Sequence, residues 1–227
     1  LSTGHRSLVK FGPMVVGDIL DTEKLVSVTR NFRPVGVVHL AGMAYVGESV
    51  ADPAIYYRNN VAGSLSVAEA MREAGCRNLV FSSSCAIYGP HRGRITEDTP
   101  KTPISPYGAS KLVTERIFAD FNRAYGFPHV NLRYFNAAGS GGDVGEIHVP
   151  ETHIIPLAIE AALSGGIFNV FGSDFDTPDG TAVRDYDRAN GGRLLEKELN
   201  IRTHPIKIVE GRNQATKAFL DHTDAES

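Results

Sequence analysis

The sequence predicts an α/β fold in which helices pack on a parallel sheet. Two features of its 227 residues point to this class. Short apolar runs alternate with longer segments of helical period, which is the pattern of repeated βαβ units. Hydrophobic residues make up 42% and charged residues 22% of the chain, so it has enough apolar surface to form a packed core.

The start of the chain contains two strand candidates separated by a helix candidate. Apolar runs at 14–18 and 36–40 predict strands, and the second resembles a strand buried on both faces. Residues 22–32 between them have a helical period, with Thr22 as the candidate N-cap. These residues therefore predict a strand–helix–strand order.

The middle of the chain contains two longer helix candidates. The first spans 52–75 and has Gly75 as its stop. Its apolar stripe consists of Ala62, Leu65, Ala68, Ala70 and Met71. A strand is expected at 78–84, and the second helix at 105–126 carries Leu112, Ile117, Phe118 and Phe121 on its apolar side.

The same rhythm continues and then weakens. The next expected elements are a strand at 129–135, a helix at 153–165 with Pro156 in its first turn, and a strand at 167–171. Turn-rich runs at 139–146 and 172–180 predict loops beyond strand ends, where parallel sheets bind ligands. After Tyr186 the chain is more polar, and we expect only a helix at 193–199 and a strand at 205–209.

Charge and cysteine content limit the possible partners. The net charge is -3 and the basic residues are scattered, so neither nucleic acid nor an anionic membrane is an expected partner. No apolar run approaches the roughly 18 residues of a membrane span. Two cysteines favour a reducing cytoplasm over a disulfide-rich secreted class. We expect a small-molecule partner.

The strongest chemical pattern combines a serine cluster with a tyrosine and a lysine. Ser82 to Ser84 end a predicted strand, and Tyr107 and Lys111 lie four residues apart on one face of a helix. An ammonium beside a phenol stabilises the phenolate, so we expect Lys111 to lower the pKa of Tyr107 toward neutrality. A Tyr-x-x-x-Lys pair alone also occurs on many solvated helices, but the serine cluster favours a proton-handling site for alcohol oxidation.

Longer strings narrow the family. They include Val46-Gly-Glu-Ser49, Tyr56-Tyr-Arg-Asn-Asn60, Arg133-Tyr-Phe-Asn-Ala-Ala-Gly139 and the run from Thr177 to Asp185. Over residues 1 to about 186 the chain resembles the UDP-glucose 4-epimerases of the extended short-chain dehydrogenase/reductase family. The resemblance implies an incomplete, Rossmann-like doubly wound parallel sheet with a remnant of a small sugar-nucleotide-binding lobe. It also implies a partial NAD-binding domain at 1–150 and a partial substrate-binding lobe with a divergent tail at 151–227.

The resemblance also implies roles for individual residues. Ser84, Tyr107 and Lys111 would form the catalytic triad, and Lys111 would also hold the nicotinamide ribose. The expected NAD contacts are Asp18, Ile19, Leu40, Ala41, Gly42, Asn59, Ser82, Tyr107, Lys111 and Tyr134. Without the resemblance, the residues alone favour ordinary roles: a turn acid for Asp18, a core position for Leu40 and a helix-surface amide for Asn59.

On the substrate side, the resemblance assigns six residues to a UDP-sugar: Ser84, Asn136, His153, Ile154, Phe171 and Arg184. Arg184 would meet the diphosphate, because a guanidinium can bind phosphate bidentately. Beside Asp185 its ordinary role would be a surface ion pair. No metal is expected at His148 and His153, since no second ligand pair accompanies them, and Cys85 is expected to be a small buried residue rather than a nucleophile.

The implied activity is NAD-dependent inversion at carbon 4 of UDP-glucose or UDP-galactose through a 4-keto sugar. Two alternatives remain: a sister epimerase for UDP-xylose and UDP-arabinose or for UDP-N-acetylhexosamines, and a non-catalytic remnant. The remnant is considered because the strand, glycine-rich turn and helix with which relatives begin are missing before Leu1, so we expect a truncated chain. A homodimer through the two long helices is expected if the fold is complete.

Overall fold

The computed structural model describes residues 4–9, 11–139, 147–149, 151–167, 169, 174–178, 180, 182–184, 186–188, 206–208 and 223–224. The chain divides into two compact units. The sheet unit comprises Val15–His91 and Thr96–Tyr134, and the C-terminal unit comprises Leu1–Met14, Arg92–Ile95 and Phe135–Ser227.

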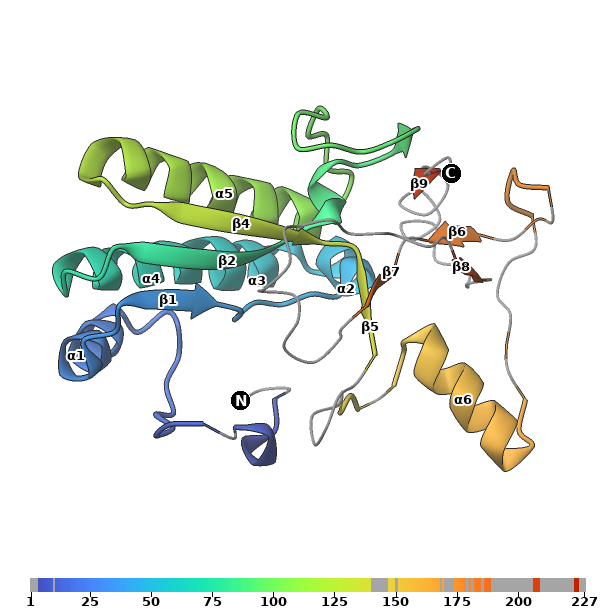
Figure 1. Cartoon of the computed structure of the whole chain (residues 1–227), viewed down its shortest axis with the longest axis horizontal. Coiled ribbons are helices and arrows are strands. Elements are labelled where there is room, and N and C mark those ends of the chain that lie inside the picture. Colours follow the sequence, from blue (N-terminus) through green and yellow to red (C-terminus); the bar gives the residue numbers. More distant parts are fainter. Residues whose placement is uncertain are drawn as a thin grey trace. The chain divides into compact units, whose positions relative to one another are not determined.

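The sheet unit is built on three parallel strands in the order β1-β2-β4. These are β1 (Gly36–His39), β2 (Asn78–Ser84) and β4 (His129–Tyr134). Figure 1 shows α4 (Gly63–Glu73) and α5 (Pro106–Tyr125) lying along one face of this sheet. The predicted α/β class with a parallel sheet is confirmed.

The helices begin and end where their capping residues place them. α1 (Thr22–Phe32) has the predicted bounds, but its N-cap is Asp21, which accepts a hydrogen bond from the Lys24 N–H at 3.0 Å. The expectation that Thr22 caps it was wrong, because the carboxylate of Asp21 stands three residues before that donor, at the N-cap position. α5 is capped by Ser105 and ends at Gly126, whose φ of 61° suits glycine.

The predicted helix at 52–75 consists of several consecutive pieces. They are α3 (Pro53–Tyr56), a π-helical turn (Tyr57–Ala62) and α4, preceded by the short helix α2 (Val46–Ala51). Leu65 of the predicted stripe is exposed rather than buried. The face that packs inward is set by Ser64, Val67 and Met71, and Leu65 falls beside it.

A hydrophobic core lies between the sheet and its helices. It is formed by Val67, Ala68, Met71, Cys76, Leu79, Phe81, Phe118 and Phe127. The rings of Phe81 on β2 and Phe118 on α5 meet edge to face, with centroids 5.2 Å apart. Alternation along β2 directs Leu79 and Phe81 to this face, which fixes the sheet against the helices.

Two strand predictions near the start need correction. The strand expected at 36–40 is not buried on both faces, since Val38 is 63% and Leu40 65% exposed. β1 is an edge strand of the described sheet, and its alternate side chains point away from the helices. Residues 14–18 form no strand, and the outer edge of β1 is therefore unpaired among the described strands.

The described residues of the C-terminal unit include short ladders and the helix α6. β5 (Asn136–Ala138) pairs in parallel with β7 (Tyr186–Arg188), and β6 (Ala182–Arg184) pairs antiparallel with β8 (Ile206–Ile208). This unit also holds α6 (Ile154–Ser164), the 3-10 helix Arg6–Leu8 and β9 (Thr223–Asp224). The 3-10 helix Cys85–Ile87 belongs to the sheet unit, and β3 (His91–Arg92) spans the boundary between the units in the sequence.

The last sequence predictions have mixed outcomes. The strand at 205–209 is confirmed by β8, and the helix at 153–165 by α6. The helix at 193–199 lies outside the described residues, and of 167–171 only Ile167 and Asn169 are described, neither in a strand. No described helix is both long and apolar enough to cross a membrane.

His39 makes the sheet unit acid-sensitive. It is buried, with Nε2 2.9 Å from the Ser64 hydroxyl, and burial, with a smaller effect of Lys111, lowers the pKa of His39 to about 4. The folded chain therefore binds fewer protons than the unfolded chain between pH 4 and 6.5, and stability is lost as pH falls through this range. We expect about 3 kcal/mol of loss from this group. Urea unfolding from pH 4 to 7 should show a shallower acid slope in His39→Gln, and identical slopes would contradict the assignment.

Candidate active site

The residues predicted to carry chemistry gather at one edge of the sheet. Residues 40–42 follow β1, Ser84 ends β2, and Tyr134 ends β4 directly opposite Ser84. The carboxyl ends of parallel strands share one edge, and that edge is where open α/β sheets bind ligands.

The start of α5 brings Tyr107 to this edge. The Ser105 hydroxyl caps the helix by accepting from the Gly108 N–H at 3.1 Å. Gly108 packs so closely that an added Cβ would lie 2.4 Å from the Ala86 carbonyl, just after the end of β2. The Ser84 hydroxyl hydrogen-bonds to the Tyr107 phenol. The serine cluster and the tyrosine are therefore brought together as the sequence predicts.

Lys111 lies one turn further along α5. Its ammonium donates to the Ser82 carbonyl at 2.8 Å and lies 5.9 Å from the centre of the Tyr107 ring. The Phe81 ring is also near, at 4.9 Å, and the Lys111 residue is only 5% exposed. Burial and the bond to the Ser82 carbonyl hold this cation beside the Tyr107 ring.

The titration of Tyr107 differs from the sequence expectation. Burial raises the pKa of Tyr107, and the hydrogen bond from Ser84 only partly opposes this. The expectation that Lys111 lowers the pKa of Tyr107 toward neutrality was wrong, because burial disfavours the charged phenolate more strongly. Burial also lowers the pKa of Lys111 to about 8.

Asn60 organises the floor of the site, and sequence reasoning gave it no role. Its amide accepts from the Met43 N–H at 2.8 Å and donates to the Met43 carbonyl at 3.0 Å and to the Ser110 hydroxyl at 3.1 Å. Its own carbonyl accepts from the Ser64 and Thr114 hydroxyls. The sequence feature that could have indicated this role is the spacing of four residues between Asn60 and Ser64 and between Ser110 and Thr114. This spacing places polar side chains on one face of each of two helices.

The other residues predicted for the cofactor occupy different surroundings. The Asn59 side-chain amide donates to Oδ1 of Asn60 at 3.1 Å. This Asn60 oxygen and the Lys111 ammonium both lie beside Gly42. Exposed Asp18 accepts from the Leu20 N–H at 2.9 Å in a turn, while Ile19 packs on Gly63. Ala41 and Leu40 are exposed.

The residues predicted for the sugar nucleotide belong to the C-terminal unit, apart from Ser84. Asn136 is the first residue of β5, and His153 and Ile154 stand at the start of α6. Arg184 ends β6, where only its backbone is described, and Phe171 lies outside the described residues.

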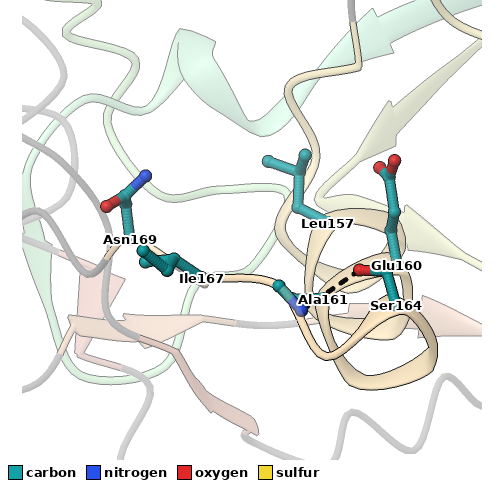
Figure 2. Close-up of a pocket in the computed structure, with 7 residues that line it drawn as sticks. Leu157, Glu160, Ala161, Ser164, Ile167 and Asn169 are labelled. Carbon is teal, nitrogen blue, oxygen red and sulfur yellow. Dashed lines mark hydrogen bonds between the residues drawn. The ribbon is translucent and has the colours of Figure 1, made fainter.

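A small hollow of ≈ 290 Å³ lies beside α6 and its C-terminal turn. Figure 2 shows Leu157, Ala161 and Ile167 around it, and Glu160 as its one carboxylate. The Ser164 hydroxyl accepts from the Gly166 N–H at 3.2 Å. Among its described lining residues, Glu160 carries the one titratable side chain.

Comparison with known proteins agrees with this geometry. A family model described as "NAD dependent epimerase/dehydratase family" matches residues 2–189. The chain belongs to this family. The Rossmann-like fold and the resemblance to UDP-glucose 4-epimerases predicted from the sequence are thereby confirmed.

Several relatives align with most of this chain but with only part of their own length. A UDP-glucose 4-epimerase of Rhizobium leguminosarum bv. trifolii is 48% identical over 82% of this chain and 58% of the relative. The structure of UDP-glucose 4-epimerase from Brucella ovis in complex with NAD is 51% identical, with a TM-score of 0.78 over 82% of this chain and 59% of that one. The Bifidobacterium longum enzyme with NAD+ and UDP is 34% identical, with a TM-score of 0.75 over 82% and 60%. The chain thus spans about three fifths of the length of these family members.

Proposed function

We propose that the protein interconverts UDP-glucose and UDP-galactose by inverting carbon 4 through a 4-keto sugar, with NAD as its cofactor. The observation that carries this proposal is the placement of Ser84, Tyr107 and Lys111 at the carboxyl edge of a parallel sheet. Relatives named UDP-glucose 4-epimerase, and structures of such enzymes with NAD and UDP, support it.

The sheet edge fits the nicotinamide half of NAD. An added Cβ on Gly42 would lie 3.2 Å from the Asn60 side-chain oxygen and 3.4 Å from the Lys111 ammonium. Because glycine has no Cβ, a bound molecule could approach the backbone closely at this position. Lys111, Asn59, Ser82 and Tyr134 would hold this half. The remaining proposed contacts are Asp18, Ile19, Leu40, Ala41 and Gly42. NAD supplies the hydride acceptor and donor when bound.

Three side chains handle the proton of the sugar. Tyr107 removes it from the 4-hydroxyl and later returns it to the 4-keto oxygen, while Ser84 hydrogen-bonds the same oxygen. The charge of Lys111 favours the phenolate, and it acts across the 5.9 Å to the ring. If the nucleotide stays bound while the 4-keto sugar rotates, the same tyrosine can exchange the proton when hydride returns to the opposite face of carbon 4.

The substrate side of the proposal uses the C-terminal unit. Asn136, His153, Ile154, Phe171 and Arg184 would contact the UDP-sugar together with Ser84. We assign residues 1–150 to a partial NAD-binding domain and 151–227 to a partial substrate lobe, acting in the cytoplasm. Exposed Leu65 and Val113, on α4 and α5, support a homodimer through these two helices.

A conversion assay with purified chain tests the activity. With NAD and UDP-galactose supplied, we expect UDP-glucose to form and NAD to bind with the chain. Parallel reactions use UDP-xylose and a UDP-N-acetylhexosamine, and faster turnover of either would assign the sister epimerase instead. If no UDP-sugar is converted and no NAD binds, the non-catalytic alternative replaces the proposal.

A further inference from the structure

A cluster of two imidazoles and one carboxylate lies just before α6. The Nδ1 atoms of His148 and His153 are 3.6 and 3.1 Å from the same Glu151 oxygen. One ligand atom from each residue lies within 4.8 Å of the others. The two rings stack with centroids 4.9 Å apart, so both present the same edge to the carboxylate.

The backbone holds the carboxylate in place. The same Glu151 oxygen accepts from the Thr152 and His153 N–H groups, both at 2.8 Å. These bonds fix the acid at the turn that leads into α6, so its position does not depend on the imidazoles. A preset oxygen between two imidazole nitrogens is a better chelate than three independent side chains.

The donor set and its spacing match a divalent transition metal. Two histidines and one glutamate form a known zinc ligand set that leaves a fourth position open. Zinc bonds of about 2.0–2.2 Å in tetrahedral geometry place neighbouring ligand atoms about 3.4 Å apart. The two distances from an imidazole Nδ1 to the Glu151 oxygen, 3.1 and 3.6 Å, bracket this separation, and all three ligand atoms lie within 4.8 Å of one another. Side-chain exposure of 15%, 21% and 54% for His148, Glu151 and His153 leaves one side open to an ion and to water.

We propose that His148, Glu151 and His153 form a zinc-binding site in the C-terminal unit. The sequence predicted no metal there, because the two histidines stand five apart without a second ligand pair. The fold supplies the third ligand by turning the chain so that Glu151 faces both rings. The site is separate in sequence from the Ser84–Tyr107–Lys111 group but shares His153 with the proposed UDP-sugar contacts, so metal binding is measured directly rather than through turnover.

Metal titration of the whole chain tests this site. The chain, prepared metal-free and without a histidine tag, is titrated with ZnCl₂ by calorimetry and with CoCl₂ by visible absorption. We expect one equivalent to bind, with intense tetrahedral Co²⁺ bands. His148→Ala, His153→Ala and Glu151→Gln should each weaken binding at least about tenfold.

Matched controls distinguish a specific zinc site from nonspecific zinc binding to other histidines and carboxylates. His5→Ala and Glu160→Gln remove the same chemical groups elsewhere in the C-terminal unit and should leave the affinity unchanged. Glu151→Gln keeps an acceptor for the two backbone N–H groups, so circular dichroism should show an unaltered fold. No saturable binding by the parent, or equal binding by the parent and the three ligand variants, would establish a hydrogen-bonded cluster only and overturn the proposal.

Discussion

Replacing Tyr107 by Phe is expected to lower the rate of epimerisation about 10²- to 10⁴-fold, the usual contribution of a positioned proton carrier. The substitution removes one oxygen, the one that receives the Ser84 hydrogen bond, and leaves the ring against Tyr56, whose centroid is 6.4 Å away. The loss should therefore fall on kcat and leave KM nearly constant. Conversion of UDP-galactose over a range of concentrations measures both values.

Tyr125→Phe is the matched control for this variant. Tyr125 ends the same helix, is exposed, and lies far along α5 from the sheet edge, so its hydroxyl should have no effect on turnover. NAD bound per chain should be equal in the two variants and the parent. If Tyr107→Phe retains the parent's kcat, Tyr107 is not the proton carrier, whatever the family of the chain.

Replacing Arg133 by Met is expected to destabilise the sheet unit by about 3–5 kcal/mol, because it leaves a buried carboxylate without its cation. Arg133 donates from Nη2 to one Glu115 oxygen at 2.8 Å and from Nε to the other at 2.9 Å. Their side chains are 18% and 7% exposed. The Ser83 hydroxyl also donates to Glu115, at 2.6 Å, so the pair ties β4, α5 and the end of β2 together.

A double-variant cycle isolates the pair from general packing. Arg133→Met with Glu115→Leu removes both charges, and we expect it to recover most of the stability lost in Arg133→Met. Urea unfolding of the parent, both single variants and the double variant gives the coupling free energy. An exposed pair, Arg30 with Glu73 at 2.8 Å, is the control, and its removal should change stability by less than about 1 kcal/mol. Equal losses from the buried and exposed pairs would contradict the prediction.

Local patterns predicted most of the sheet unit correctly. The bounds of α1, β2 and α5 follow from apolar spacing and from capping residues within a few positions, because helix and strand periodicity are properties of neighbouring residues. The proximity of Ser84 and Tyr107 could be expected as well, since parallel strands present their carboxyl ends at one edge.

What the sequence by itself determined is the alternation of strands and helices, the family strings and the one-turn spacing of Tyr107 and Lys111. Only the tertiary structure decided which strand lies at the edge, which face of β1 is exposed, and that burial raises the pKa of Tyr107. It also decided that Asn60 joins a loop to two helices and that Glu151 turns toward two imidazoles. Strand order, burial and such contacts depend on which distant segments pack together, and no single segment carries that information.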